Sequence, residues 1–178
     1  VSSNTSTNPT SVLCGGVAMT KAVGGVPHYN SVSGIGTQTS IWYLETTQSG
    51  STLISGSSGG TGAQDGVAYT FEITGTTAFT PYATASANNA GSEALSETIT
   101  VDGQSGGVTI VVGGFAGPGT AAVSGGNLSI DQQNAEPFAQ YFVASASNIS
   151  GGNTTYTVTK TSNTATNSMF SLHAASFG

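Results

Sequence analysis

Apolar side chains recur at every second position in several short runs of this sequence, and this spacing constrains the fold more than any other feature. In the run 154–161, Tyr156 and Val158 alternate with threonines. In the run 66–74, one parity holds all the large apolar side chains, namely Val67, Tyr69, Phe71 and Ile73. A period of two is typical of a β-strand with one buried and one solvent-facing side. We therefore expect these four side chains to point into the core together.

Nine short apolar-rich runs are separated by clusters of Gly, Asn and Ser. They are Gly16–Ala22, Gln38–Glu45, Gly66–Thr74, Thr84–Ala87, Leu95–Val101, Gly107–Phe115, Ala139–Ala146, Thr154–Thr161 and Met169–Phe177. The stretch VTIVV is apolar throughout, as in a central strand, and no window has a persuasive helical period. The sequence predicts an all-β fold with negligible helix. We expect an antiparallel two-sheet β-sandwich, jelly-roll-like, with about nine short strands.

The first twelve residues differ from the rest because they are almost all polar and include Pro9. We expect an extended N-terminal tail over 1–12 and a single β-sandwich domain over 13–178, because no later linker is long enough to divide two domains. Residues 1–13 carry no basic region and no long apolar region, so they do not have the pattern of a signal peptide.

Charged side chains are scarce, whereas hydroxyl groups and glycines are abundant. The chain has two Lys and no Arg, eight Asp and Glu, 26 Gly, 25 Ser and 27 Thr, and its net charge is −6. Two lysines cannot form the basic face that nucleic-acid binding needs, and no apolar run is long enough to span a membrane. With 37% hydrophobic residues, the chain can nevertheless bury a core. Low charge also lets identical subunits pack closely.

One motif resembles a hydrolase nucleophile. Ser58 lies in a G-x-S-x-G pattern, and Asp65, Asp102, Asp131 and His173 follow it in the order of α/β-hydrolases. That motif needs a strand before it and a helix after it, but a glycine-rich loop and a strand follow here. A glycosidase needs two facing carboxylates, and we expect Glu72 to be solvated on the wet face of its strand instead. We predict no catalytic residue and no enzymatic activity.

Metal and cofactor sites are not predicted. His28, His173 and Cys14 lack the spacing of a zinc site. The loop Asp131–Glu136 is the best place for calcium bound partly by backbone carbonyls, although no EF-hand pattern is present. The glycine-rich segment 113–119 lacks the lysine of a phosphate loop.

Three loop aromatics are the candidate ligand contacts, namely Tyr29, Tyr82 and Phe138. Each either stacks on a sugar ring or anchors its own loop.

We expect Trp42 in the core, Cys14 as a small buried or half-buried residue near a turn, and His173 in a sheet, on its wet face or hydrogen-bonded at an interface. Lys21 and Lys160 are the only lysines that an isopeptide cross-link to Asn would use.

Several motifs together resemble one group of proteins. GGVAMTKA, SIWYLE and AYTFEITG, followed by VTIVVGGF and a final AASF, resemble a diffuse family of phage and phage-like virion proteins with β-sandwich, jelly-roll or lectin-like domains. The resemblance covers most of the chain after Cys14. It implies a non-enzymatic structural virion protein, such as a head fibre, decoration or tail-appendage subunit.

The resemblance also implies partners: other copies of the chain, other virion proteins and a host-surface glycan. Family members usually have one or two strands before the GVAMT element, where this chain has a polar tail. We therefore expect an oligomer in which the segment 1–12 completes a sheet edge, the other possibility for this tail being that it only tethers the domain to a particle. The alternative to a structural virion protein is a secreted or surface-attached carbohydrate-binding module or extracellular filament subunit.

Overall fold

All regular secondary structure in the described part of the chain is β. The computed structural model describes residues 9–25, 28–29, 36–45, 52–58, 68–75, 78, 80–89, 95–116, 119–135, 139–161 and 170–178. Among these residues there is no helix and every strand pair is antiparallel, which confirms the all-β prediction. The strands are β1 Pro9–Cys14, β2 Val17–Ala18, β3 Thr20–Gly24, β4 His28–Tyr29, β5 Gly36–Thr37, β6 Ser40–Tyr43, β7 Ile54–Ser58, β8 Ala83–Asn89, β9 Ser96–Gly103, β10 Val108–Ala116, β11 Ala121–Ser124, β12 Ser129–Ala135, β13 Ala139–Ser147, β14 Gly152–Lys160 and β15 Phe170–Phe177.

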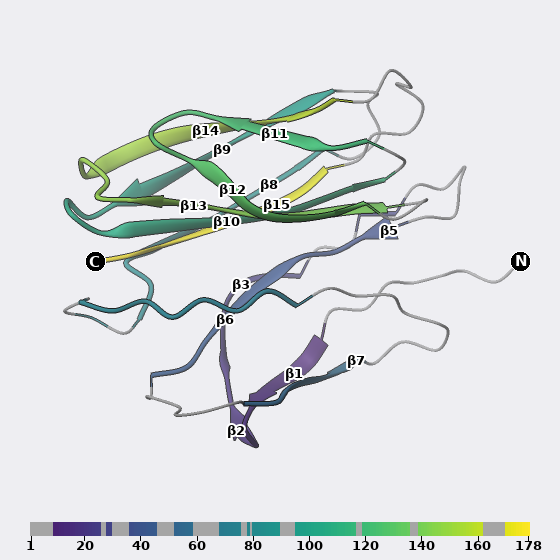
Figure 1. The fold of residues 1–178 in the computed structure, drawn as a ribbon, viewed down its shortest axis with the longest axis vertical. Helices are drawn as coiled ribbons and strands as arrows, with labels where there is room; N and C mark the ends of the chain where they lie inside the picture. The colour runs from purple at the N-terminus through teal and green to yellow at the C-terminus, as the bar shows by residue number, and fades with distance from the viewer. Residues whose placement is uncertain are drawn as a thin grey trace, which may run out of the picture.

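These strands form stacked layers rather than two sheets (Figure 1). A five-stranded sheet, in the order β12-β13-β10-β15-β8, lies in the middle. The three-stranded sheet β11-β14-β9 covers one of its faces, and the pair β3-β6 lies against the other. The sheet β2-β1-β7 lies beyond β3-β6, and β4 pairs with β5. The described residues thus hold more strands and more sheets than the sequence predicts.

Strands β8 to β15 pair in a nested order. β8 pairs with β15, β9 with β14, and β10 with β13. A tight turn joins β11 to β12 at the centre of this series, where the amide of Leu128 donates to the carbonyl of Gly125 at 3.2 Å. β10 also pairs with β15. This pairing brings the outermost pair of the series, β8 and β15, into the same sheet as the inner pair, β10 and β13.

The larger core lies between the five-stranded and three-stranded sheets. Its most deeply buried large side chains are Tyr156, Phe115, Phe142, Phe170, Ile99 and Leu172. The rings of Phe115 and Phe170 pack with centroids 5.5 Å apart. As the sequence predicts, the VTIVV stretch belongs to a central strand, since β10 lies between β13 and β15.

A smaller core fills the opposite face of the five-stranded sheet. It consists of buried side chains from β6, β10, β13 and β15, namely Ile41, Ile110, Val143, Ala175 and Phe177. Because β15 packs against a layer on each side, all of its residues are buried, including Ser171, His173 and Ser176. The expectation of sheets with one wet face therefore holds for β9 and β14 but not for β15.

The segment 68–75 departs from its alternating pattern. It forms no strand, and Phe71 is 42% exposed, so the prediction that four side chains of this run enter the core together is wrong. Tyr69 and Ile73 do pack, half-buried, against the smaller core. Val67 lies outside the described residues. Without a partner strand to fix the pleat, every-second-residue spacing does not hold all of a run on one face.

Part of the expected N-terminal tail is a strand. β1 begins at Pro9, where the missing amide costs least, and pairs with β7 of the same chain. The hydroxyl groups of Ser11 and Ser57 lie 2.8 Å apart across this pair. Residues 1–8 of the expected tail lie outside the described part of the chain.

Candidate interaction surface

The outward side of the three-stranded sheet is covered by small, mostly hydroxylated side chains. We call this surface the hydroxyl face, and it comprises Ser96, Thr98, Thr100, Ala122, Ser124, Thr155, Thr157 and Thr159. Each of these residues is exposed or half-buried, whereas their neighbours of opposite parity are more deeply buried. Alternation along each strand therefore creates the face.

The strand register places these hydroxyl groups in rows across the sheet. Thr100 lies opposite Thr155, and their Oγ1 atoms are 2.7 Å apart. Thr157 lies between Thr98 on β9 and Ser124 on β11. Neighbouring strands are about 4.8 Å apart, and residues i and i+2 along a strand are about 7 Å apart. The result is a regular two-dimensional array of hydroxyl and methyl groups.

The buried side of the same sheet holds this array in place. Tyr156, Val158 and Ile99 are at most 2% exposed and alternate with the threonines of the face. A register slip by one residue would expose these side chains and bury the hydroxyls, so the packing of the core specifies the face. The β-branched threonines also have restricted χ1 rotamers, which lowers the entropy lost when they enter a contact.

The eight residues of the hydroxyl face include no ionised side chain, and one carboxylate, Asp102, borders them. The three sheet strands contain three charged residues, Glu97, Asp102 and Lys160. Glu97 and Lys160 have the parity of the inward-facing residues. Asp102 has the outward parity of Ser96, Thr98 and Thr100 and lies half-buried at the end of β9, at the margin of the face. A partner that covers this face would therefore displace water from hydroxyls and methyls, without the several kcal/mol that desolvating an ion costs.

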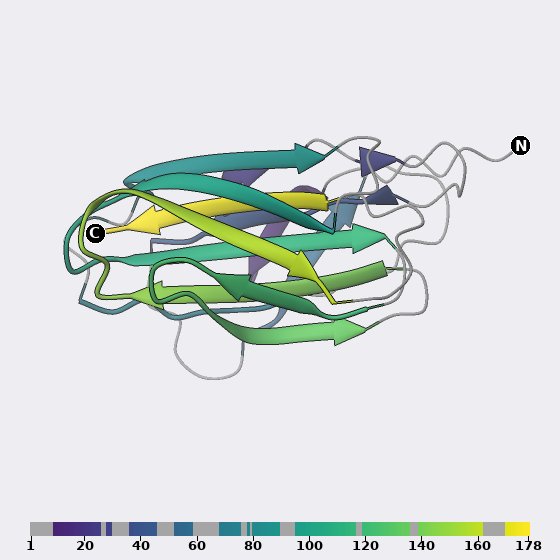
Figure 2. The ribbon, with the colours of Figure 1, turned by 90° about the horizontal axis from the view of Figure 1, so that it is seen from above.

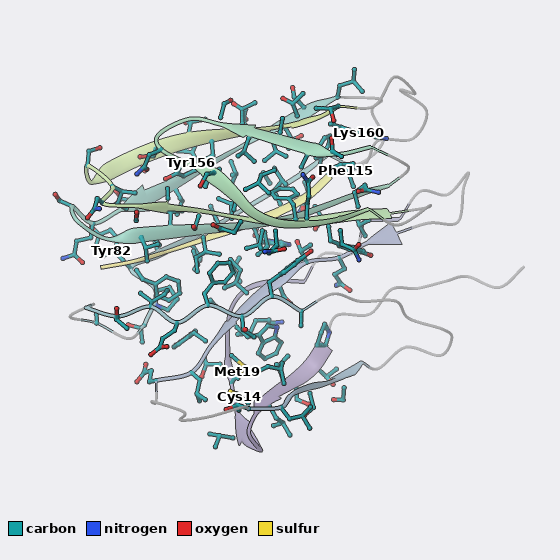
Figure 3. The ribbon with its side chains drawn as sticks, viewed as in Figure 1. Cys14, Met19, Tyr82, Phe115, Tyr156 and Lys160 are labelled. Atoms are coloured by element: carbon teal, nitrogen blue, oxygen red, sulfur yellow. The ribbon has the colours of Figure 1, made fainter. Side chains whose placement is uncertain are left out.

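Lys160 lies inside the larger core, at one end of the sheet (Figure 3). Its side chain is 2% exposed, and its Nζ lies 5.6 Å from the centroid of the Phe115 ring. Burial lowers the pKa of Lys160 from its ordinary value of 10.5. The ring face contributes a favourable cation–π contact, which opposes that desolvation.

The lowered pKa of Lys160 makes stability depend on pH. Because the unfolded chain binds this proton more tightly than the folded one, the free energy of unfolding rises as pH climbs from the folded pKa toward 10.5. The slope is at most about 1.4 kcal/mol per pH unit. We expect urea unfolding at pH values from 7 up to about 10.5 to show this rise in the wild type and in Lys21→Met, but not in Lys160→Met. An equal rise in all three proteins would show that another group titrates.

The three candidate ligand aromatics do not form one site among the described residues. Tyr82 is 54% exposed just before β8, and its amide donates to the carbonyl of Ser176 (Figure 3). Tyr29 lies in β4 rather than in a loop, and Phe138 lies outside the described residues. Tyr82 is therefore the one member of this set whose exposed ring the structure describes.

Trp42 and Cys14 take different environments. Trp42 is half-buried on the side of β6 away from Ile41, and its indole N–H donates to Ser40 Oγ at 2.9 Å. The core position on this strand thus belongs to Ile41 rather than to Trp42. Cys14 is half-buried at the end of β1, next to a turn, as predicted.

The serine motif and His173 lie in different sheets. Residues 56–58 lie within β7, so the strand–turn–helix context of the nucleophile motif is absent from these described positions. His173 lies on β15 and is 1% exposed, so it is not on a wet face. Its Nδ1 is 2.9 Å from Ser86 Oγ on β8, and its Nε2 is 3.5 Å from Ser171 Oγ. The sequence pattern gave no signal for the Ser86 contact, because that contact depends on which strand lies beside β15.

The other candidate sites also change with the fold. Asp131 and the residues up to Ala135 belong to β12, so the segment named as the best place for a calcium loop is a strand at these residues. Glu72 is exposed, although not on a strand.

Within the described ranges, no three His, Cys, Asp or Glu side chains are grouped to hold a metal ion. The same ranges contain no helix with the length and hydropathy needed to cross a bilayer.

Comparison with known proteins identifies no relative: no protein-family model, no curated protein and no solved structure matches the chain.

Proposed function

We propose that β8 to β15 form a jelly roll, a two-sheet β-sandwich of eight strands. The nested pairs β8-β15, β9-β14 and β10-β13 support this proposal, as does the central turn between β11 and β12. A long hairpin rolled in this way divides its strands between two facing sheets, with a core such as that around Phe115 between them.

We infer that the chain is a non-enzymatic structural subunit of a virion, such as a head fibre, decoration or tail-appendage protein. Its partners are further copies of itself and other virion proteins, and the appendage role extends to a host-surface glycan. The hydroxyl face is the observation that carries this proposal. It is a rigid and uncharged array on the outside of a layered β domain, suited to repeated close packing of identical subunits.

A carbohydrate-binding module or extracellular filament subunit is the second candidate. The exposed ring of Tyr82 favours it, because an exposed aromatic ring offers an apolar face beside a polar hydroxyl group. The two candidates differ in where the protein is found. Immunogold electron microscopy with an antibody against the chain distinguishes them: gold on virus particles supports the virion subunit, and gold only on cell surfaces or free filaments supports the alternative.

The role of the hydroxyl face in assembly is testable in solution. We expect Thr98→Lys, which places a charge in the middle of the face, to lower the mass of the assembly measured by analytical ultracentrifugation. Thr70→Lys is the matched control, since Thr70 is also exposed but lies outside the face. Assembly that falls equally in both variants, or in neither, would contradict this role.

Salt provides an independent readout of the same contact. Ionic contacts between subunits weaken at about 1 M salt, where the Debye length is about 3 Å. Contacts between hydroxyls and methyls do not, so we expect the wild-type mass to be unchanged between about 0.05 M and 1 M NaCl. Dissociation at high salt would show that ion pairs hold the subunits together.

A further inference from the structure

The two edges of the five-stranded sheet are protected very differently. β12 and β8 lie at its opposite margins, β12 in light green and β8 in teal (Figure 2). β12 carries Asp131, and its pairing with β13 is interrupted by an irregularity between Ile130 and Gln132. β8 has the sequence ATASANN, without charge or proline, and pairs with β15 over seven consecutive residues without a shift.

Exposed sheet edges are templates for pairing with another strand, and natural proteins block them with charges, prolines or bulges. β12 has two of these devices, a charge and a bulge. β8 has none, although it is as long and its ladder is more regular. In the described part of the chain no strand pairs with the outer edge of β8, and an edge without such a partner or such devices is suited to accept a strand.

The side chains of β8 also suit close approach by another backbone. Ala83, Ala85 and Ala87 pack half-buried against the larger core, while Thr84 and Ser86 are exposed. These small side chains leave the outer edge sterically open. Ser86 lies at the centre of β8, and the hydrogen bond between its Oγ and Nδ1 of His173 on β15 fixes its position.

The composition of β8 favours a second copy of the same strand as its partner. In an antiparallel pair related by a two-fold axis, the residue at the axis lies opposite its own counterpart, and the residues on either side of it lie opposite each other. A charged edge would repel itself in that arrangement, as β12 would through Asp131. β8 contains no charged residue, so its self-pairing brings no like charges together.

We propose that β8 is a contact between two copies of this chain, which pair β8 with β8 antiparallel and join their five-stranded sheets into one continuous sheet. This inference rests on the proposed function, in which copies assemble, and it names a surface separate from the hydroxyl face. It also revises the expectation that residues 1–12 complete an edge. Residues 9–12 of β1 already pair with β7 within the chain.

Single-cysteine cross-linking tests this contact directly. In a Cys14→Ser background, Thr84→Cys, Ser86→Cys and Asn88→Cys place a thiol along β8, and Thr70→Cys is the control. Residues opposite each other near the two-fold axis have Cα atoms about 5 Å apart, within the range that a disulfide bridges. Mild oxidation should give reducible dimers from at least one β8 variant and none from the control. Equal cross-linking by the control, or none from any β8 variant, would overturn the proposal.

Introducing a charge at this edge separates the β8 proposal from the proposed function. Thr84→Lys places like charges across the two-fold axis and should halve the mass of the assembly, while Thr70→Lys leaves it unchanged. If Thr84→Lys has no effect but Thr98→Lys lowers the mass, the β8 contact is wrong and the assembly function stands. If deletion of residues 1–8 halves the mass but Thr84→Lys does not, the tail is the contact and the β8 proposal is overturned. A wild type that is monomeric at every concentration contradicts both.

Discussion

Replacing Phe115 with alanine should destabilise the protein by about 3–5 kcal/mol. The ring is fully buried between the two sheets and packs against Phe170 at a centroid distance of 5.5 Å and an interplanar angle of 49°. Its removal leaves a cavity between side chains that strands β10 and β15 hold in register, so the site cannot collapse easily. It also removes the aromatic face beneath the Lys160 ammonium, which then lies in an apolar interior without that contact.

Phe71→Ala is the matched control for this substitution. Phe71 is 42% exposed, and we expect its replacement to change the free energy of unfolding by about 0.5 kcal/mol or less. Urea unfolding followed by tryptophan fluorescence measures both variants through the single tryptophan. A loss of several kcal/mol in Phe71→Ala, or a near-neutral Phe115→Ala, would mean that the buried and exposed phenylalanines have been assigned wrongly.

Gly113→Val should destabilise the protein by about 1–3 kcal/mol through overpacking. Gly113 lies on β10 directly between Phe142 of β13 and Leu172 of β15. A Cβ at this position would overlap the Phe142 ring and lie 2.6 Å from Leu172 Cδ2. Both neighbours are at most 1% exposed, so neither can move into solvent. The glycine therefore makes room for an aromatic ring on the next strand.

Gly56→Ala is the control for a strand glycine without such a neighbour. A Cβ there would meet Ser11 O at 3.6 Å and Val12 Cγ2 at 3.9 Å, which are ordinary contacts. We expect its unfolding midpoint in urea to match the wild type within error. If Gly113→Val unfolds at the same urea concentration as Gly56→Ala, then Phe142 packs over Gly113 loosely enough to admit a valine side chain.

The alternation of apolar and polar residues predicts a strand correctly where that strand pairs with a neighbour on both sides or packs against a core. Tyr156 and Val158 are buried and their threonine neighbours face outward, as the pattern of β14 indicates. The same reasoning fails for Phe71, because alternation identifies a shared face only when hydrogen bonds to a neighbouring strand hold the pleat. The sequence alone does not say which runs find a partner.

Burial on both faces was the second feature that local pattern did not reveal. β15 reads as a mixed strand with Ser171, His173 and Ser176 among apolar residues, which predicts one wet side. All three are buried because layers cover the five-stranded sheet from both directions. Layer number depends on contacts between distant segments, such as the one between Thr39 and Ser171. The alternation of residues within one strand carries no information about such contacts between distant segments.

The hydroxyl face was predictable in part. The threonines of β9 and β14 are visible as the polar half of two alternating runs. Their arrangement in rows required the register, and the extension to Ser124 required β11, which the sequence did not suggest as a strand. The three loop aromatics, in contrast, follow only from the exposure expected of turns, and among the described residues Tyr82 alone of the three has a ring shown to be exposed.

The position of β15 has a consequence for how the chain is made. This strand fills the gap between β10 and β8, whose residues are synthesised much earlier. Until residues 170–177 leave the ribosome, β8 and β10 have unsatisfied edges that face each other, and the larger core lacks Phe170 and Leu172. Such pairings between distant segments close slowly, and open edges of this kind bind other chains. The nascent chain is therefore most vulnerable to aggregation just before β15 emerges from the ribosome.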